Sequence, residues 1–245
     1  MSNRALDVQG VDSGYGEVQV LRDLTLHLKS DEIVCIIGPN GAGKSTVLKT
    51  VFGLLKPWTG TVELDGRDIA GEDPEDLVRT GMGYVPQVDN VFSSLTIDEN
   101  LKMGGVARKE GLQARIDELY DQFPILDEKR TAKAKTLSGG QRQVLAFARA
   151  LVMDPDVLLI DEPSAGLAPN IVQSVFQDVQ KVNELGTSVL MVEQNAREGL
   201  AISDRGYVLD QGTVAYEGQA GSLLDDPEVS RLYMGGADYE GVEGE

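Results

Sequence analysis

The segment GPNGAGKS, residues 38–45, decides more about this chain than any other stretch of similar length. It fits the pattern G-x-x-x-x-G-K-[ST], in which a glycine-rich turn connects a strand to a helix. It follows the apolar run IVCII and precedes KSTVLKTVFGL, whose apolar residues recur at helical spacing. The residues of this apolar face are Val47, Leu48, Val51 and, one position after the quoted stretch, Leu55. The order strand, turn, helix predicts an α/β fold with an anion-binding loop at the end of a strand.

The residues of this loop suit a nucleoside triphosphate. Glycine at 38, 41 and 43 lets the backbone turn its N–H groups inward around an anion. We expect Lys44 to reach the β- and γ-phosphates of ATP and the Ser45 hydroxyl to ligate Mg²⁺. The predicted nucleotide-binding residues of the loop are Gly38, Pro39, Asn40, Gly41, Ala42, Gly43, Lys44, Ser45 and Thr46. The alternative is a glycine-rich loop that holds no ligand.

A second feature is the stretch VLLIDEPSAGLAP, residues 157–169, in which an apolar strand ends on Asp161 and Glu162. Two carboxylates beside an apolar core cost free energy unless a positive partner lies nearby. Lys44 and nucleotide-bound Mg²⁺ supply that partner if this strand is a neighbour of the one before the loop. We then expect Asp161 to face Mg²⁺, Glu162 to position the water that attacks the γ-phosphate, and the two acids to titrate together. If the Lys44 loop lies elsewhere, they are strand-end acids in solvent.

The rest of the chain alternates strands and helices. The first third reads as short strands rich in β-forming residues: ALDVQGVDSGY, VQVLRDLTLHL and EIVCIIG. Further on, one helix, NIVQSVFQDVQKVNEL, joins the apolar strands 157–160 and 189–192, and Gly186 stands where a helix cap is expected. Such a pair predicts a mostly parallel sheet covered on both faces. We also expect a helix in SGGQRQVLAFARAL and a hairpin in GYVLDQGTVAYEG.

Residues 89–137 differ in character from the segments on either side. The stretches ENLKMGG, LQARIDELYDQF and DEKRTAKAK are polar, charged and poor in β-branched residues, so we predict a helical insert. Residues 1–88 and 138–235 then form the core, which includes antiparallel strands near the N-terminus. The last ten residues, 236–245, read GADYEGVEGE. They are acidic and rich in glycine, which predicts a loose tail.

Composition excludes some partners and locations. The formal net charge is −18, with 40 acidic against 22 basic residues, so we expect no nucleic acid as a primary partner. Such an excess also suits a host rich in salt. No apolar run approaches the roughly 18 to 20 residues that cross a bilayer, and the beginning of the sequence has no secretory signal. We therefore expect a protein kept inside the cell, with its one cysteine, Cys35, buried as a small hydrophobe.

A third motif, LSGGQ at residues 137–141, starts the helix QRQVLAFARAL. Ser138, Gly139 and Gly140 offer backbone N–H groups at a helix N-terminus, followed by Gln141, which together form a second anion site. An ordinary serine cap with flexible glycines is the alternative. One chain has little use for two γ-phosphate sites, whereas two chains facing head to tail can each cover the nucleotide of the other.

With these three motifs, residues 5–234 resemble the ATP-binding subunit of ABC transporters. The resemblance implies that Tyr15 stacks on adenine and that Gln87 in YVPQ contacts Mg²⁺, the attacking water and the membrane subunits. It also implies that SAGL, residues 164–167, crosses the dimer interface. Without the resemblance, Tyr15 is an exposed loop tyrosine and Gln87 has no assigned role.

The stretches LKMGG, DEPSAGLAP and VEQN followed by DRGYVL are similar to the branched-chain amino acid uptake branch of that family. In most of the family a histidine that contacts the γ-phosphate follows the strand that matches SVLMVE here. In this chain Gln194 stands there; it can donate a hydrogen bond but cannot carry a proton. The sole histidine, His27, lies in an early strand and is expected to be a sheet residue, so Glu162 has more of the water positioning to do.

The resemblance implies an ATPase that binds ATP and Mg²⁺ and closes as a homo- or heterodimer on transmembrane permeases, which work with a solute-binding protein. The helical insert near Gln87, with Val91 and Phe92 in VDNVFSSL, is the expected docking surface, although a local core role fits those two residues equally. The location is the cytoplasmic face of the cell membrane, as a peripheral subunit. Two alternatives remain: a transporter ATPase for urea, another amide or a lipid, and a soluble ABC protein outside transport.

Overall fold

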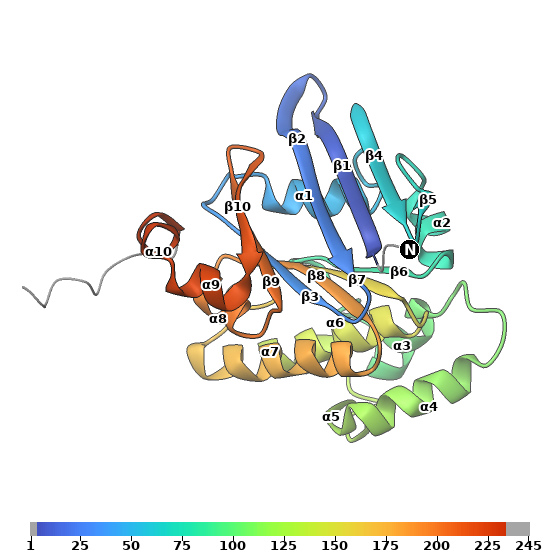
Figure 1. Ribbon diagram of the computed structural model, residues 1–245. Helices are drawn as coiled ribbons and strands as arrows, with labels where there is room; N and C mark the ends of the chain where they lie inside the picture. Colours follow the sequence, from blue (N-terminus) through green and yellow to red (C-terminus); the bar gives the residue numbers. More distant parts are fainter. Residues whose placement is uncertain (1–3, 234–245) are drawn as a thin grey trace, which may run out of the picture.

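The computed structural model describes residues 4–233, which form two β-sheets with helices packed around them (Figure 1). The strands are β1 (Arg4–Tyr15), β2 (Val18–Lys29), β3 (Ile33–Ile37), β4 (Thr59–Leu64), β5 (Arg67–Asp68), β6 (Met82–Val85), β7 (Val157–Asp161), β8 (Ser188–Val192), β9 (Arg205–Asp210) and β10 (Thr213–Gln219). The helices are α1 (Lys44–Val51), α2 (Pro74–Arg79), α3 (Ile97–Gly104), α4 (Leu112–Gln122), α5 (Pro124–Asp127), the 3₁₀ turn η1 (Ala134–Thr136), α6 (Gly139–Leu151), α7 (Pro169–Glu184), α8 (Ala196–Ala201), α9 (Ala220–Asp225) and α10 (Pro227–Tyr233). None of these helices is long and apolar enough to cross a bilayer. The predicted tail, residues 236–245, lies outside the described residues.

The larger sheet is mostly parallel, as the sequence predicts. Its strand order is β10-β9-β3-β8-β7-β6; only β10 runs antiparallel to its neighbour, β9. The second sheet, β2-β1-β4-β5, is antiparallel. The expectation that Asp161 ends a strand next to the one before the glycine-rich loop is wrong, because β8 pairs with both β3 and β7 and separates them. Local patterns fix which segments become strands, but they do not fix the order of strands in the sheet.

Alternate residues of the central strands face two different cores. Val34 and Ile36 of β3 pack in the core that contains α1 and the antiparallel sheet, whereas Cys35 and Ile37 face the core that contains α6 and α7. Figure 1 shows α6 and α7 below the larger sheet, with α1, β1 and β2 above it. Every residue of β3, β7 and β8 is buried, Cys35 as expected, so the C-terminal ends of these strands are held by packing on both faces.

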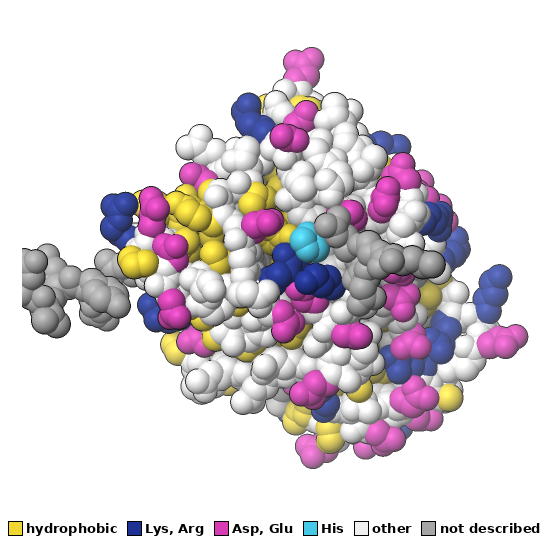
Figure 2. Space-filling model, in the orientation of Figure 1, with side chains coloured by type: hydrophobic (Ala, Val, Ile, Leu, Met, Phe, Trp, Pro, Cys, Tyr) yellow, Lys and Arg dark blue, Asp and Glu magenta, His cyan; other side chains and the backbone are white. Residues whose placement is uncertain are grey.

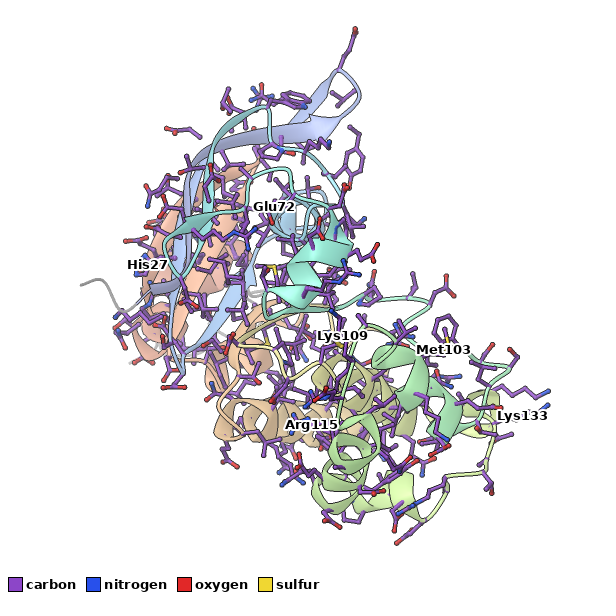
Figure 3. The ribbon with its side chains drawn as sticks, turned by 90° about the vertical axis from the view of Figure 1, so that its right-hand side faces the viewer. His27, Glu72, Met103, Lys109, Arg115 and Lys133 are labelled. Carbon is purple, nitrogen blue, oxygen red and sulfur yellow. The ribbon has the colours of Figure 1, made fainter. Side chains whose placement is uncertain are left out.

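The segment 89–137 contains α3, α4, α5 and η1. Figure 3 shows the chain as two lobes, with Glu72 in the lobe of β-sheets and Met103, Arg115 and Lys133 in the helical lobe. The two lobes share a core, because residues of α3 and α4 pack in the same cluster as those of α6 and α7. The helical lobe is therefore held against the core helices by a continuous apolar contact.

Within this segment, the prediction that DEKRTAKAK, residues 127–135, is helical is wrong. Only its first residue belongs to α5; the next four form turns, and the last two belong to the 3₁₀ turn η1. The carbonyl of Ala132 accepts a hydrogen bond of 3.1 Å from the N–H of Ile97. Thr96 also forms an isolated antiparallel bridge with Lys133. Pairing with the start of α3 satisfies these backbone groups, so tertiary contact overrides the helical preference of the segment.

The helix after the glycine-rich loop is shorter than predicted. Val47, Leu48 and Val51 form its buried face, as expected, but α1 ends at Val51 and Leu55 lies beyond it, only half-buried. Gly53 has φ 72°, a left-handed conformation that ends helices and that glycine adopts without steric cost. The helix therefore ends before Leu55, which does not belong to its buried face.

Candidate functional site

The glycine-rich loop connects β3 to α1, and its conformation needs glycine. Gly41 and Gly43 have φ values of 83° and 104°, in the left-handed region that other residues rarely adopt. At Gly38 a Cβ atom would lie 2.2 Å from the carbonyl oxygen of Leu209, so β9 leaves no room for a side chain. Gly43 is the N-cap of α1, whose first N–H groups have no acceptor within the helix. The loop therefore offers backbone donors at the positive end of a helix dipole, as anion binding requires.

Lys44 is buried at the start of α1 and bends back over the loop. Its Nζ donates to the carbonyl oxygens of Gly38 at 2.9 Å and Pro39 at 3.2 Å. The same atom lies 3.9 Å from Oε1 of Glu162. The loop thus folds around one ammonium group within reach of the carboxylate that follows β7, although β8 separates β3 from β7.

Asp161 and Ser45 lie in direct contact. The Ser45 hydroxyl donates to Oδ1 of Asp161 at 2.9 Å, and the hydroxyl of Tyr84, from β6, donates to Oδ2 at 3.3 Å. Burial and the charge of Asp161 raise the pKa of Tyr84, so this phenol remains a donor near neutral pH. The ring of Tyr84 stacks on Phe52 with centroids 5.1 Å apart. Asp161 is therefore held on both oxygens by residues of different elements.

Glu162 follows Asp161 and turns away from the strand. Its φ is 45°, in the left-handed region that is rare for residues other than glycine and is often found at functional sites. Its Oε2 accepts a hydrogen bond of 2.7 Å from Nε2 of Gln87, which lies on the loop after β6. Gln87 is exposed, whereas the Glu162 side chain is 12% exposed. Three segments distant in sequence thus meet around one carboxylate.

Tyr15 and Gln194 are both exposed: Tyr15 lies near α1, and Gln194 lies beside the glycine-rich loop. Tyr15 ends β1, is 46% exposed, and has Nζ of Lys49 from α1 at 6.0 Å from its ring centroid. Gln194 follows β8, is exposed, and lines a hollow together with Gly38 and Asn40. Of the two, Gln194 is the one that the structure places beside the loop.

The motif at the start of α6 lies apart from this group. Ser138 caps the helix: its Oγ accepts from the N–H of Gln141 at 3.3 Å, and Oε1 of Gln141 accepts from the N–H of Ser138 at 3.2 Å. These two residues and Gly140 line a hollow with residues of α5 and α7, and no residue of the glycine-rich loop lines it. The structure does not bring residues 138–141 to the loop of the same chain.

Two residues that the sequence analysis missed hold the site together. Tyr84 lies within the motif YVPQ and bonds Asp161. Glu193 directly follows β8, and its carboxylate accepts hydrogen bonds from Ser164, in the loop after Glu162. An acid directly after a buried strand was the available signal for Glu193, but its partners depend on the strand order.

The donor set fits a nucleotide with Mg²⁺. The loop supplies backbone N–H groups and one lysine for phosphates, and the Ser45 hydroxyl, the Asp161 carboxylate and the Gln87 amide are the hard oxygen ligands that Mg²⁺ prefers. Within residues 4–233 no group of three or more His, Cys, Asp or Glu side chains could hold a metal alone. Magnesium sites completed by substrate phosphates have this composition, with one or two carboxylates from the protein.

The fold and the site define the class: an α/β nucleotide-binding protein with a phosphate-binding loop, a strand-end acid pair and a separate serine–glycine helix cap. A family model described as ABC transporter matches residues 21–165. The chain therefore belongs to the ABC transporter family, as one of its ATPase subunits.

Individual relatives and solved structures agree with this assignment. The chain is 40% identical over 232 residues to the high-affinity branched-chain amino acid transport ATP-binding protein BraG of Pseudomonas aeruginosa, covering 94% of this chain and 100% of the relative. It is 42% identical over 227 residues to the probable branched-chain amino acid transport ATP-binding protein LivF of Archaeoglobus fulgidus, covering 92% and 96%. It is 34% identical to the lipopolysaccharide export system ATP-binding protein LptB of Escherichia coli, covering 94% and 97%. An ATP-binding cassette of an ABC transporter in its ADP conformation superposes with a TM-score of 0.86 at 27% identity, covering 96% and 100%.

Proposed function

We propose that this chain is the ATP-hydrolysing subunit of an ABC importer for branched-chain amino acids. The observation that carries the ATPase role is the meeting of Lys44, Asp161 and Glu162 at the glycine-rich loop, with Lys44 Nζ 3.9 Å from Oε1 of Glu162. The names of the relatives at 40% and 42% identity support the solute.

Each residue has a role that follows from its position. Lys44 neutralises phosphate charge beside the backbone donors of the loop, and Tyr15 stacks on the base. Ser45, Asp161 and Gln87 are the residues that would hold Mg²⁺, and the ion would neutralise charge on the phosphates. Glu162 orients the attacking water and accepts its proton. The hydrogen bond from Gln87 keeps the Glu162 carboxylate near the loop. Taken together, these roles make catalysis mainly a matter of positioning and charge neutralisation.

The separation of residues 138–141 from the loop supports a dimer. Because these residues line a hollow that no loop residue shares, their backbone donors suit the nucleotide of a second ATP-binding subunit, either the same chain or a related one. Gln194, beside Gly38, donates a hydrogen bond to the γ-phosphate in the place of a histidine. Closure of such a dimer on two nucleotides supplies the motion that drives transport.

The surface of the helical lobe near Gln87 is the proposed docking site for transmembrane permeases, which places the subunit on the cytoplasmic face of the membrane. Exposed apolar side chains gather in this stretch of the sequence: Val88 (69% exposed), Phe92 (44%), Met103 (45%) and Val106 (78%). Figure 3 shows Met103 at the surface of α3, on the side of the helical lobe that faces the viewer. Val91 instead packs against the core, and the guanidinium of Arg149 lies 5.0 Å from the ring centroid of Phe92. Only Phe92 of the pair suits docking.

A lipid exporter is the second candidate, because LptB is 34% identical over nearly the whole chain. The higher identity to the branched-chain amino acid proteins favours the importer. Uptake of labelled leucine by vesicles that contain this chain with its permeases distinguishes the two. Leucine uptake that requires ATP and a solute-binding protein supports the importer, and its absence with retained lipid extraction supports the exporter.

The ATPase role is tested with Glu162→Gln. We expect Mg²⁺-dependent ATP hydrolysis to fall at least about a hundredfold, because the amide cannot accept a proton from water. Nucleotide affinity should stay near that of the original chain, because the loop is unchanged. Glu118→Gln, which alters an exposed carboxylate of α4, is the matched control and should hydrolyse ATP at the original rate. Equal rates for the two variants would remove Glu162 from the chemistry.

A further inference from the structure

Glu193 is a buried acid that the proposed catalytic roles leave unused. It follows β8, between Val192 and Gln194, and is 1% exposed. Its backbone N–H continues the sheet by donating to the carbonyl of Ile36 at 3.0 Å, so the position of its Cα is fixed by β3. The side chain points into the protein, whereas the next residue, Gln194, is exposed.

The Glu193 carboxylate joins two loops. Its Oε1 accepts a hydrogen bond of 2.9 Å from the N–H of Ser164, and its Oε2 accepts one of 2.8 Å from the hydroxyl of the same serine. Oε2 also accepts a bond of 3.2 Å from the N–H of Asn195. Ser164 lies two residues after Glu162, and Asn195 lies one residue after Gln194. One side chain therefore connects the loop that carries Glu162 to the loop that carries Gln194.

The surroundings of this carboxylate are built around it. Gly199 of α8 leaves its space open, since a Cβ there would lie 3.1 Å from Cβ of Glu193 and 2.9 Å from Sγ of Cys35. Burial raises the pKa of Glu193 more than the bonds from Ser164 and Asn195 lower it. Burying an acid in such a place costs free energy that its hydrogen bonds offset, so these bonds, and not the filling of space, explain how the carboxylate is held.

We propose that Glu193 is a positioning residue that makes the Ser164–Leu167 loop and the Gln194–Asn195 loop move as one unit. The inference rests on the proposed function, in which SAGL meets the second subunit and Gln194 meets the γ-phosphate. When the second subunit displaces the Ser164 loop, the Glu193 carboxylate carries that displacement to Gln194. Approach of the partner is thereby linked to completion of the phosphate site.

Kinetics test the consequence of this link. Glu193→Gln keeps the size of the side chain but turns an NH₂ group toward the N–H of either Ser164 or Asn195, so at least one bond is lost. We expect kcat to fall about tenfold per active site, counted by nucleotide binding, with KM for ATP unchanged. Ser164→Ala should lower kcat about threefold, and the double variant should be no slower than Glu193→Gln alone, because both changes break one connection. Multiplying effects, or a kcat within about twofold of the original in Glu193→Gln, would overturn the proposal.

Amide hydrogen exchange tests the joining itself and needs no turnover. Glu193→Gln should speed exchange in residues 164–167 and 194–195 together, and Ser164→Ala should do so to a smaller degree. Glu118→Gln and Ser222→Ala, at exposed positions of α4 and α9, are the controls and should leave both loops unchanged. If the original chain hydrolyses no ATP, the proposed function fails, and the exchange of the two loops still decides whether Glu193 joins them. Faster exchange in one loop only, or in neither, would contradict the inference.

Discussion

Three acids at neighbouring strand ends have different environments, and the environments separate their roles. Asp161 is bonded by two hydroxyls, one of them from the Ser45 side chain that is also proposed to ligate Mg²⁺. Glu162 is bonded by the exposed amide of Gln87, which a ligand or a partner can reach. Glu193 is enclosed and bonded by two backbone N–H groups and a hydroxyl. The accessible acid suits chemistry, and the enclosed one suits positioning.

A fourth acid predicts a pH effect on stability. Burial raises the pKa of Asp178, on α7, to about 6, while the charge of Lys181 lowers it only in part. Since an unfolded aspartate titrates near pH 4, the folded state binds more protons between about pH 4 and 6. Below about pH 4 the carboxyl is protonated in both states, so its burial does not lower the free energy of unfolding. Above about pH 6 it is charged in both states, and the cost of burying that charge lowers the free energy of unfolding in full.

Asp178→Asn removes this penalty. We expect the variant to gain about 1 kcal/mol of unfolding free energy near pH 8, a value reduced to allow for solvent screening, and to gain nothing near pH 4. Urea unfolding at the two pH values measures the difference. Asp121→Asn, at an exposed position of α4, is the control and should change little at either pH. A gain that is the same at both pH values would assign the effect to packing and not to titration.

At the scale of elements, the guanidinium of Arg205 connects the two sheets and pairs with Glu32, which lies between β2 and β3. Nε of Arg205, in β9, donates to Oε1 of Glu32 at 2.6 Å, and Nη2 donates to the carbonyl of His27, in β2, at 2.7 Å. Nη1 also donates to the hydroxyl of Tyr207 at 3.1 Å. Burial opposes the charged form of Glu32, but the bonds to Arg205 and to the backbone of Lys29 prevail and lower its pKa. His27 is a sheet residue, as predicted.

Arg205→Leu should destabilise the fold by about 3–5 kcal/mol, because it leaves the Glu32 carboxylate buried without its partner. The double variant with Glu32→Leu should recover part of this loss, because no unpaired charge then remains in the core. Thermal and urea unfolding of the single and double variants provide the comparison. If the double variant is less stable than Arg205→Leu, the pair contributes through Glu32 and its bond to the N–H of Lys29 instead.

The start of α6 carries a prediction about assembly. Ser138→Arg removes the helix cap and places a large cation where the second subunit is proposed to contribute its nucleotide. We expect nucleotide binding by the isolated chain to persist, because the glycine-rich loop lies elsewhere, and ATP hydrolysis to fall at least about a hundredfold. Ser138→Ala removes only the cap, at about 1 kcal/mol, and should leave part of the activity. Hydrolysis by Ser138→Arg at the rate of Ser138→Ala would contradict the dimer.

The sequence allowed the elements of the site to be predicted, but not all of their contacts. The glycines of residues 38–45 and the apolar runs before Lys44 and Asp161 specify strand, turn and helix locally, and the structure has them. The pairing of β6 with β7, which brings Tyr84 to Asp161, and the position of β8 between β3 and β7, which places Glu193, both depend on how the sheet assembles, so these bonds had no local signal. The turns within residues 127–135 follow from pairing with α3, which is equally non-local.

At the scale of the whole molecule, the charge of −18 opposes the proposed dimer. On the face drawn in Figure 2, acidic side chains are spread over the surface with Lys and Arg between them, and they do not form a single patch. Two such subunits repel each other over the whole approach. The Debye length falls from about 10 Å at 0.1 M salt to about 3 Å at 1 M, so salt removes most of this repulsion between exposed charges.

We therefore expect ATP-dependent dimerisation of the Glu162→Gln variant to strengthen as salt rises from about 0.1 M to about 1 M, by about tenfold or more in the dissociation constant. Sedimentation velocity with ATP and Mg²⁺ measures it, and sucrose in place of salt controls for crowding. Adding Glu17→Gln, Glu75→Gln and Glu110→Gln, all at exposed positions, removes three acidic charges and should flatten the salt dependence. Association that weakens with salt would show that ion pairs across the interface outweigh the net repulsion, and that the acidic surface is not an adaptation to high salt.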